Sequence, residues 1–90
     1  MKILIDQNIP FIKGVFEPYA TVEYMPGAAI TSREAADADT LIIRTRTRCD
    51  SSLLYGSRVS MIATATIGFD HIATGYCAEN GITVARAAGG

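Results

Sequence analysis

Five short apolar runs divide the 90-residue chain, and polar or small residues separate them. Each run has the length of a buried strand, whereas the intervening segments carry apolar residues at helical spacing or the start and stop signals of helices. Strands are predicted over 2–5, 21–25, 41–43, 59–63 and 82–85, and helices over 10–16, 31–34, 51–55 and 70–79.

This alternation of strands and helices, joined by short connections, predicts an α/β fold with a parallel sheet. We expect a flavodoxin-like sheet of about five strands in the order 2-1-3-4-5, with helices on both faces. Ninety residues are enough for one small domain, so residues 1–90 are taken as a single unit.

Local signals mark the ends of the predicted helices. Pro10 suits the first turn of a helix, and the pair Asn80-Gly81 suits the positive φ that often ends one. The side chains expected to cap helix N-termini are Asn8, either Thr31 or Ser32, Asp50 and Asp70.

The segments that follow the strands are the candidate ligand site, because open parallel sheets bind ligands at the carboxyl ends of their strands. These segments are 6–8, 44–46, 64–68 and 87–90. The first and third strands flank the point where the strand order reverses, and the fourth lies beside the third. We therefore expect Arg44, Thr45 and Thr66 to converge.

The loop 64–68 is the most informative part of that edge. A buried strand, a loop of small hydroxylated residues and a helix capped by Asp70 together resemble an anion pocket, in which free N–H groups and the helix dipole face the ligand. Thr64 and Thr66 flank Ala65 and are expected to point in opposite directions, so that one serves the backbone and the other the ligand. Gly68 is expected to adopt a conformation forbidden to other residues and to admit a ligand closely.

Three arginines follow the third strand at alternate positions, Arg44, Arg46 and Arg48. In extended backbone they share one face, and guanidinium groups bind carboxylate and phosphate well. The alternative is a solvated loop whose arginines pair with Asp50 or Glu34, an interpretation that suits Arg46 and Arg48 better than Arg44.

The remaining reactive side chains favour structural roles. His71 has no recognisable nucleophile and acid beside it, so we expect a structural or interdomain role rather than catalysis. Cys49 and Cys77 lie 28 residues apart with a single histidine in the chain, which argues against zinc and for two reduced thiols. A phosphoacceptor receiver domain is excluded, since Arg44 ends the third strand where that class needs an aspartate.

Composition narrows the possible partners. The net charge of −1 gives no reason to expect nucleic-acid binding, and no apolar run approaches a membrane span. The N-terminus reaches Asp6 too soon for a signal peptide, so a cytoplasmic location is expected. The 49% apolar content and mean hydropathy of +0.23 indicate strands buried on both faces, or apolar surface meant for another domain or subunit.

The whole chain resembles the N-terminal segment of the erythronate-4-phosphate dehydrogenases, a branch of the NAD-dependent 2-hydroxyacid dehydrogenases. The motif Thr-Ala-Thr-x-Gly-x-Asp-His is specific to this branch. The residues that carry the resemblance are 2–10, Pro26-Gly27, 36–39, Arg44-Thr45, Leu53-Leu54, 63–72 and 80–82.

The resemblance implies a role for several residues. The segment would be the first part of a substrate-binding domain whose ligand is 4-phospho-D-erythronate, a phosphorylated 2-hydroxyacid. Thr45 (commonly a serine in this family) and Thr66 match substrate-binding positions, and the backbone of Ile67 and Gly68 would face the substrate carboxylate. Arg44 is a further expected partner for phosphate or carboxylate.

The same resemblance shows what this chain lacks. The family's nucleotide-binding domain, with its glycine-rich fingerprint, and its catalytic arginine, glutamate and histidine all come after this segment. The 90-residue chain is therefore expected to be an N-terminal fragment that is inactive alone and binds no NAD. It is also expected to self-associate or form a homodimer. The alternative is a free-standing, non-catalytic flavodoxin-like module for anion binding or protein interaction.

Overall fold

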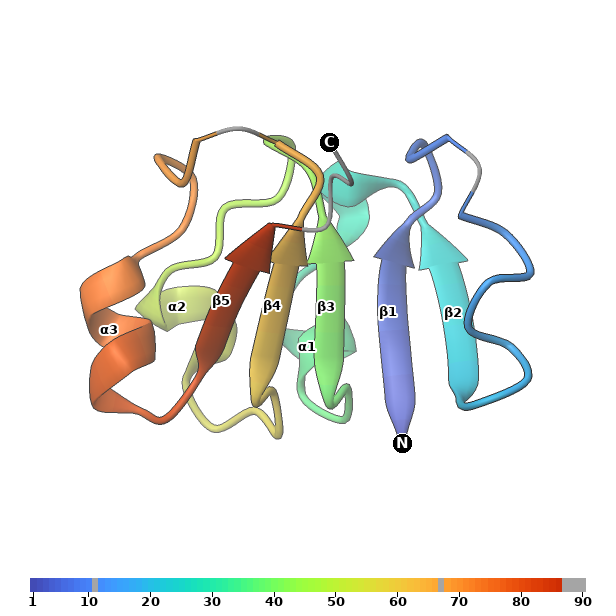
Figure 1. Cartoon of the computed structure of the whole chain (residues 1–90). Helices are drawn as coiled ribbons and strands as arrows, with labels where there is room; N and C mark the ends of the chain where they lie inside the picture. Colours follow the sequence, from blue (N-terminus) through green and yellow to red (C-terminus); the bar gives the residue numbers. More distant parts are fainter. Residues whose placement is uncertain (11, 67, 87–90) are drawn as a thin grey trace.

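Five parallel strands form one sheet in the order β2-β1-β3-β4-β5 (Figure 1), which confirms the predicted order. The structure, a computed structural model, describes residues 1–10, 12–66 and 68–86. The strands are β1 Lys2–Asp6, β2 Thr21–Met25, β3 Thr40–Ile43, β4 Met61–Thr64 and β5 Thr83–Arg86.

The register of the sheet sorts its apolar residues onto two faces. Leu4 pairs with Leu41, which in turn pairs with Ile62. These three side chains point to the face that the helices cover, where they join a large buried cluster. The neighbouring row, with Ile5 and Ile42, points to the opposite face. Both faces of the central strands are therefore apolar, as expected for a parallel sheet.

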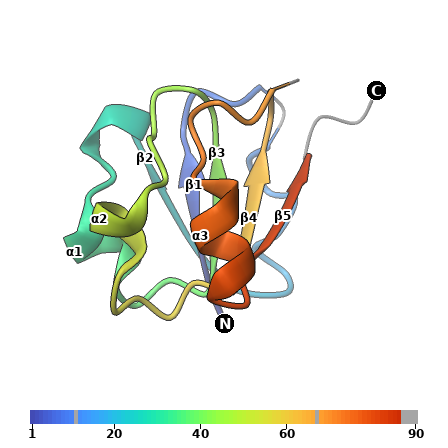
Figure 2. The same ribbon diagram turned by 90° about the vertical axis from the view of Figure 1, so that its left-hand side faces the viewer.

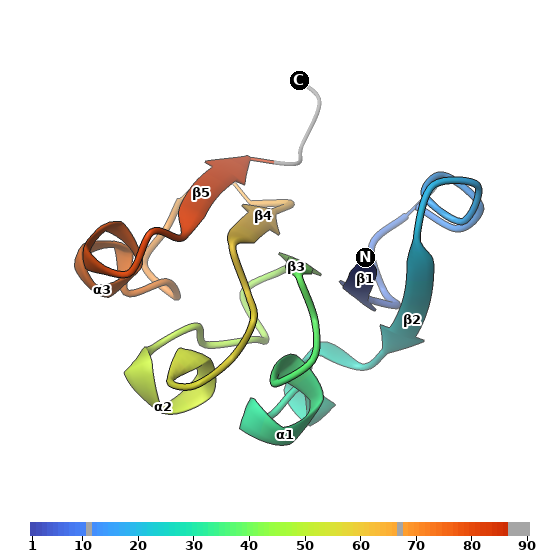
Figure 3. The ribbon, with the colours of Figure 1, turned by 90° about the horizontal axis from the view of Figure 1, so that it is seen from below.

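Four short helical segments lie between the strands: the 3-10 helix η1 (Gly27–Ala29), α1 (Ser32–Ala35), α2 (Ser51–Leu54) and α3 (Thr74–Glu79). Figure 3 shows α1, α2 and α3 side by side on one face of the sheet, and Figure 2 shows the same layer from the side. Within the described part of the chain, no helix has the length and apolarity needed to cross a membrane.

The opposite face is covered differently, and here two predictions are wrong. Residues 10 and 12–16 form turns and bends instead of the expected helix, and Phe11 lies outside the described residues. Gly14 has a φ of 85°, and Pro18 follows four residues later. A left-handed glycine and a nearby proline leave too short a run to offset the cost of helix nucleation. The helices described therefore cover one face of the sheet and not both.

The segment 7–20 still packs against that second face, through Ile9, Ile12 and Phe16. It covers β1 and β2, whereas β3, β4 and β5 border an apolar trough of about 630 Å³. Ile42 and Ala63 form part of its floor, and the half-exposed Val15 stands at its side. Apolar side chains, among them Val15 and Met61, are therefore exposed at this trough.

The signals for the shorter helices are confirmed. Asp50 caps α2, where its carboxylate accepts a hydrogen bond from the Leu53 N–H at 3.1 Å. Thr31 is the N-cap residue of α1. Gly81, just after α3, has the predicted positive φ of 70°. Asn8 caps no helix, and its N–H instead donates to the Asp6 carboxylate at 2.9 Å.

Candidate functional site

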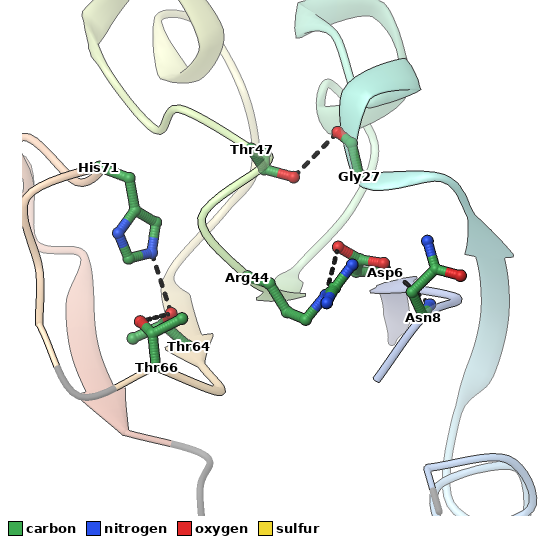
Figure 4. Close-up of polar contacts among 8 residues, drawn as sticks. All are labelled: Asp6, Asn8, Gly27, Arg44, Thr47, Thr64, Thr66 and His71. Carbon is green, nitrogen blue, oxygen red and sulfur yellow. Dashed lines mark hydrogen bonds and ion pairs between the residues drawn. The ribbon is translucent and has the colours of Figure 1, made fainter. Parts of the chain in front are cut away.

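Two polar clusters stand at the edge of the sheet where β1, β3 and β4 end (Figure 4). The first contains Thr64, Thr66 and His71, and we call it the threonine–histidine chain. The second is the Asp6 cluster, which contains Asp6, Asn8, Gly27, Arg44 and Thr47.

The threonine–histidine chain is a continuous row of hydrogen bonds. His71 Nε2 lies 2.9 Å from Thr64 Oγ1, which lies 2.7 Å from Thr66 Oγ1. The Thr66 hydroxyl donates to the Gly68 carbonyl at 2.9 Å. The expectation that Thr64 and Thr66 point in opposite directions is wrong, because side chains two positions apart along extended backbone lie on the same side of it. Both hydroxyls consequently belong to one network.

His71 is buried and holds no place in a helix. Helix α3 begins at Thr74 and not at Asp70, so the predicted Asp70 cap is wrong. The reason is tertiary: the Cys49 N–H donates to the His71 carbonyl, and the Ala73 N–H donates to the Cys49 carbonyl, both at 2.8 Å. This parallel bridge holds 71–73 extended. Helix α3 therefore does not start directly after the loop, and the argument from the dipole of a helix capped by Asp70 does not apply.

Burial also sets the charge of His71. Desolvation lowers the pKa of its imidazole below the ordinary value of 6.5, and the nearby Asp70 carboxylate opposes this shift only in part. The ring is therefore neutral at pH 7 and carries a single N–H, so it is suited to hydrogen bonding rather than to ionic contact with a ligand.

An open hollow of about 470 Å³ lies beside this chain. It brings together three of the residues predicted to bind substrate, Thr45, Thr66 and Gly68. The other residues that line it are Ala65, Asp70 and His71. Ile67, the remaining loop residue of the prediction, lies outside the described residues.

Of the two properties predicted for Gly68, the open space agrees with the structure and the special backbone conformation does not. Its φ is outside the left-handed region, so the expectation of a conformation forbidden to other residues is wrong. A Cβ at this position would have no neighbour within 4 Å. The glycine therefore leaves open space at the hollow, where a ligand has room to approach.

Arg44 is directed away from this hollow and toward β1. Its Nε lies 3.3 Å from Oδ2 of Asp6, a carboxylate that is fully buried, while the Arg44 side chain is 35% exposed. The predicted row of three arginines on one face is wrong, because 45–46 form a turn in which the Thr47 N–H donates to the Arg44 carbonyl at 3.3 Å. Arg46 and Arg48 are exposed.

Asp6 is the residue that the sequence interpretation missed. Its second oxygen accepts the Asn8 N–H, and Gly27 packs directly against Oδ2. The Thr47 hydroxyl donates to the Gly27 carbonyl at 2.9 Å, which fastens the loop after β3 to the loop after β2. The available signal was a carboxylate placed at the end of a fully apolar run, where burial demands a partner.

Among the described residues, the turn at Gly27 does not fit NAD. A dinucleotide site needs a glycine-rich turn whose backbone leaves space for a pyrophosphate. The space against Gly27, at the start of η1, is instead filled by the Asp6 carboxylate, which has the same sign of charge as phosphate. Nor do the described residues contain a group of three side chains able to hold a metal ion.

The sequence and the fold can now be compared with known proteins. Residues 4–90 match the family model for the catalytic domain of the D-isomer specific 2-hydroxyacid dehydrogenases. The chain belongs to this family. Its similar relatives include erythronate-4-phosphate dehydrogenases of Bacteroides fragilis, Bacteroides thetaiotaomicron and Azotobacter vinelandii, at 58%, 56% and 44% identity over 99% of this chain. It spans only 23–26% of the length of these relatives.

A solved structure, titled for the pyruvate reductase of Chlamydomonas reinhardtii, has the same fold. It superposes with a TM-score of 0.78 at 21% identity, and the match covers 99% of this chain and 29% of that one. At this identity the likeness concerns the fold alone. The family assignment rests on the sequence, and the strand order agrees with it.

Proposed function

We propose that this chain is the N-terminal part of the substrate-binding domain of an NAD-dependent erythronate-4-phosphate dehydrogenase, an oxidoreductase of pyridoxal phosphate biosynthesis. The relatives that carry this name support the proposal. The observation that carries it is structural: Thr45 and Thr66, from the ends of β3 and β4, line the same hollow.

In this proposal the hollow binds an oxyanion of 4-phospho-D-erythronate. The hydroxyls of Thr45 and Thr66 donate hydrogen bonds to the substrate carboxylate, and the backbone of Ile67 and Gly68 faces the same group. Arg44, held by its ion pair with Asp6, is the proposed partner of a further anionic group at this edge of the sheet. Hydrogen bonds to charged oxygens are about twice as strong as those between neutral groups.

The rest of the reaction is assigned to residues outside this chain. Oxidation of the C2 hydroxyl to 2-oxo-3-hydroxy-4-phosphobutanoate needs a hydride acceptor and an acid–base pair. The buried Asp6 carboxylate against Gly27 argues that NAD binds elsewhere. The 90-residue chain alone is accordingly proposed to be inactive, and the complete enzyme to be a cytoplasmic homodimer.

The apolar trough favours a second candidate function. A face bordered by Ile42, Ala63 and the 47%-exposed Val15 is suited to contact with another protein surface. A non-catalytic module that binds a partner through this face is therefore the alternative to a dehydrogenase.

The test is an assay of the full-length gene product. With 4-phospho-D-erythronate and NAD we expect the absorbance at 340 nm to rise as NADH forms, at a rate that saturates with substrate concentration. With D-erythronate, which lacks the phosphate, we expect kcat/KM to be at least a hundredfold lower. Calorimetry of the 90-residue chain should detect no saturable NAD binding. A gene product that ends at Gly90, or one with no turnover, would favour the protein-interaction module; micromolar NAD affinity of the short chain would contradict the assignment of NAD to another domain.

A further inference from the structure

We propose that His71 is a positioning residue that acts through Thr64 to keep the proton of the Thr66 hydroxyl available for donation toward the ligand hollow. The inference rests on the proposed function, since it concerns the same hollow. It goes beyond that function because it assigns roles to Thr64 on β4 and His71 in the loop before α3. Neither of these buried residues needs to contact the substrate.

The hydrogen bonds fix the direction of the chain. The single proton of the Thr66 hydroxyl is committed to the Gly68 carbonyl at 2.9 Å. In its 2.7 Å contact with Thr64, Thr66 must therefore accept, and the Thr64 proton is used there. Thr64 then has no proton left for His71. The 2.9 Å contact with His71 can form only if Nε2 carries the imidazole proton and donates it.

Burial supports this choice of tautomer. Thr64 is fully buried and His71 is 8% exposed, so an unmatched donor or acceptor between them would be costly. Desolvation keeps the imidazole neutral, with one proton to place. The charged group nearest to the ring is Asp70, which is exposed to solvent and lies at the rim of the hollow.

The consequence reaches the ligand through Thr66. Because Thr64 donates to its oxygen, the Thr66 hydroxyl does not spend its proton on Thr64, and the proton can rotate from the Gly68 carbonyl onto an incoming acceptor atom. Hydrogen bonds in a row also polarise one another, which strengthens the terminal donor. The hollow is thus set to bind oxyanions.

Two substitutions of His71 separate this role from simple packing. The amide nitrogen of glutamine reaches about as far as Nε2, whereas that of asparagine reaches about as far as Nδ1. His71→Gln therefore keeps a donor for Thr64, and His71→Asn does not. Thr64→Ser and Thr64→Val form the equivalent pair at the next position. Cys77→Ala, a buried truncation in α3 outside this row of hydrogen bonds, controls for loss of stability.

In the full-length gene product we expect His71→Asn and Thr64→Val to raise KM for 4-phospho-D-erythronate about fivefold or more, the value of one hydrogen bond. KM for NAD and kcat should change less than twofold. His71→Gln, Thr64→Ser and Cys77→Ala should each stay within twofold of wild type in KM. Equal KM values for His71→Gln and His71→Asn would overturn the proposal.

A second measurement does not depend on the enzyme activity. His71 is the only histidine of the 90-residue chain, so its ring nitrogens can be assigned directly by ¹⁵N NMR. We expect the Nε2–H tautomer at pH 7.5, and the Nδ1–H tautomer would overturn the chain of donors. If wild-type enzyme fails to oxidise the phosphorylated hydroxyacid while the Nε2–H tautomer is found, the proposed function fails and the relay stands.

Discussion

Gly27 is the glycine at which an added side chain would meet its neighbours most closely. A Cβ built there lies 2.5 Å from Oδ2 of Asp6 and 3.0 Å from Cβ of Arg46. Ordinary contact begins at 3.4 Å, so Gly27→Ala requires the carboxylate to retreat by about 0.9 Å. Asp6 is fully buried and held by both Asn8 and Arg44, which leaves it little room to move.

The magnitude follows from two effects. Overpacking of a tight site costs about 1–3 kcal/mol. Movement of the carboxylate also weakens its contacts with Asn8 and Arg44, and a buried charge that loses its partner is strongly destabilising. We therefore expect Gly27→Ala to lower the free energy of unfolding by about 2–4 kcal/mol, a large share of the roughly 5–13 kcal/mol typical of 90 residues.

Urea denaturation of the 90-residue chain measures this directly. With a slope of about 1–1.5 kcal/mol/M, the midpoint should fall by about 2 M. Gly68→Ala is the matched control, because its Cβ would meet nothing within 4 Å, and its free energy of unfolding should stay within about 0.5 kcal/mol of wild type. In an Asp6→Ala background, Gly27→Ala should cost less than about 1 kcal/mol. An unchanged midpoint for Gly27→Ala alone would refute the reasoning.

Three further predictions concern stability and reactivity. Asp50→Ala should lower the free energy of unfolding by about 1 kcal/mol in thermal denaturation, because it removes the cap of α2, and Asp50→Ser should recover most of it. Burial raises the pKa of the Cys49 thiol to about 12, so it should react with a disulfide reagent at pH 8 only as the chain unfolds; rapid labelling of the native chain would contradict this. The lowered pKa of His71 means that the unfolded state takes up the proton first, so stability should fall as pH drops below 6.5; His71→Gln should flatten this dependence between pH 5 and 7.5.

The arrangement of the strands could be predicted because it depends on strong local signals and general rules. Each strand is a short apolar run between polar or small residues, and right-handed connections leave few possible orders. The capping of α2 by Asp50 and the positive φ of Gly81 were equally local. These features need no knowledge of the rest of the chain.

Two of the features that were not predicted involve contacts between distant parts of the sequence. The helix expected from Asp70 starts four residues later because Cys49 pairs with 71–73. The burial of Asp6 under Gly27 joins residues 21 positions apart, and neither carries a pattern that names the other. The periodicity of apolar residues indicates which face of a helix or strand is buried. It does not indicate which distant residues contact each other.

The candidate site was predicted in part. Thr45, Thr66 and Gly68 were expected at one edge of the sheet, and the structure brings them to one hollow. The hydrogen-bond chain behind Thr66 was not expected, because the two threonines were assigned to opposite sides, although side chains two positions apart in extended backbone share one side. Its continuation to the buried His71 joins Thr64 to a residue seven positions away, which no local pattern indicates.

The central claim is that the Thr66 hydroxyl donates to an anionic group of the substrate. The most direct test is the steady-state KM of Thr66→Val and Thr66→Ser in the full-length gene product, with 4-phospho-D-erythronate varied at saturating NAD. Loss of one hydrogen bond to a charged group predicts a rise in KM of about 10- to 150-fold for Thr66→Val. Thr66→Ser should retain most of the affinity, and KM for NAD should change less than twofold in both. A KM for Thr66→Val equal to that of wild type would contradict the account.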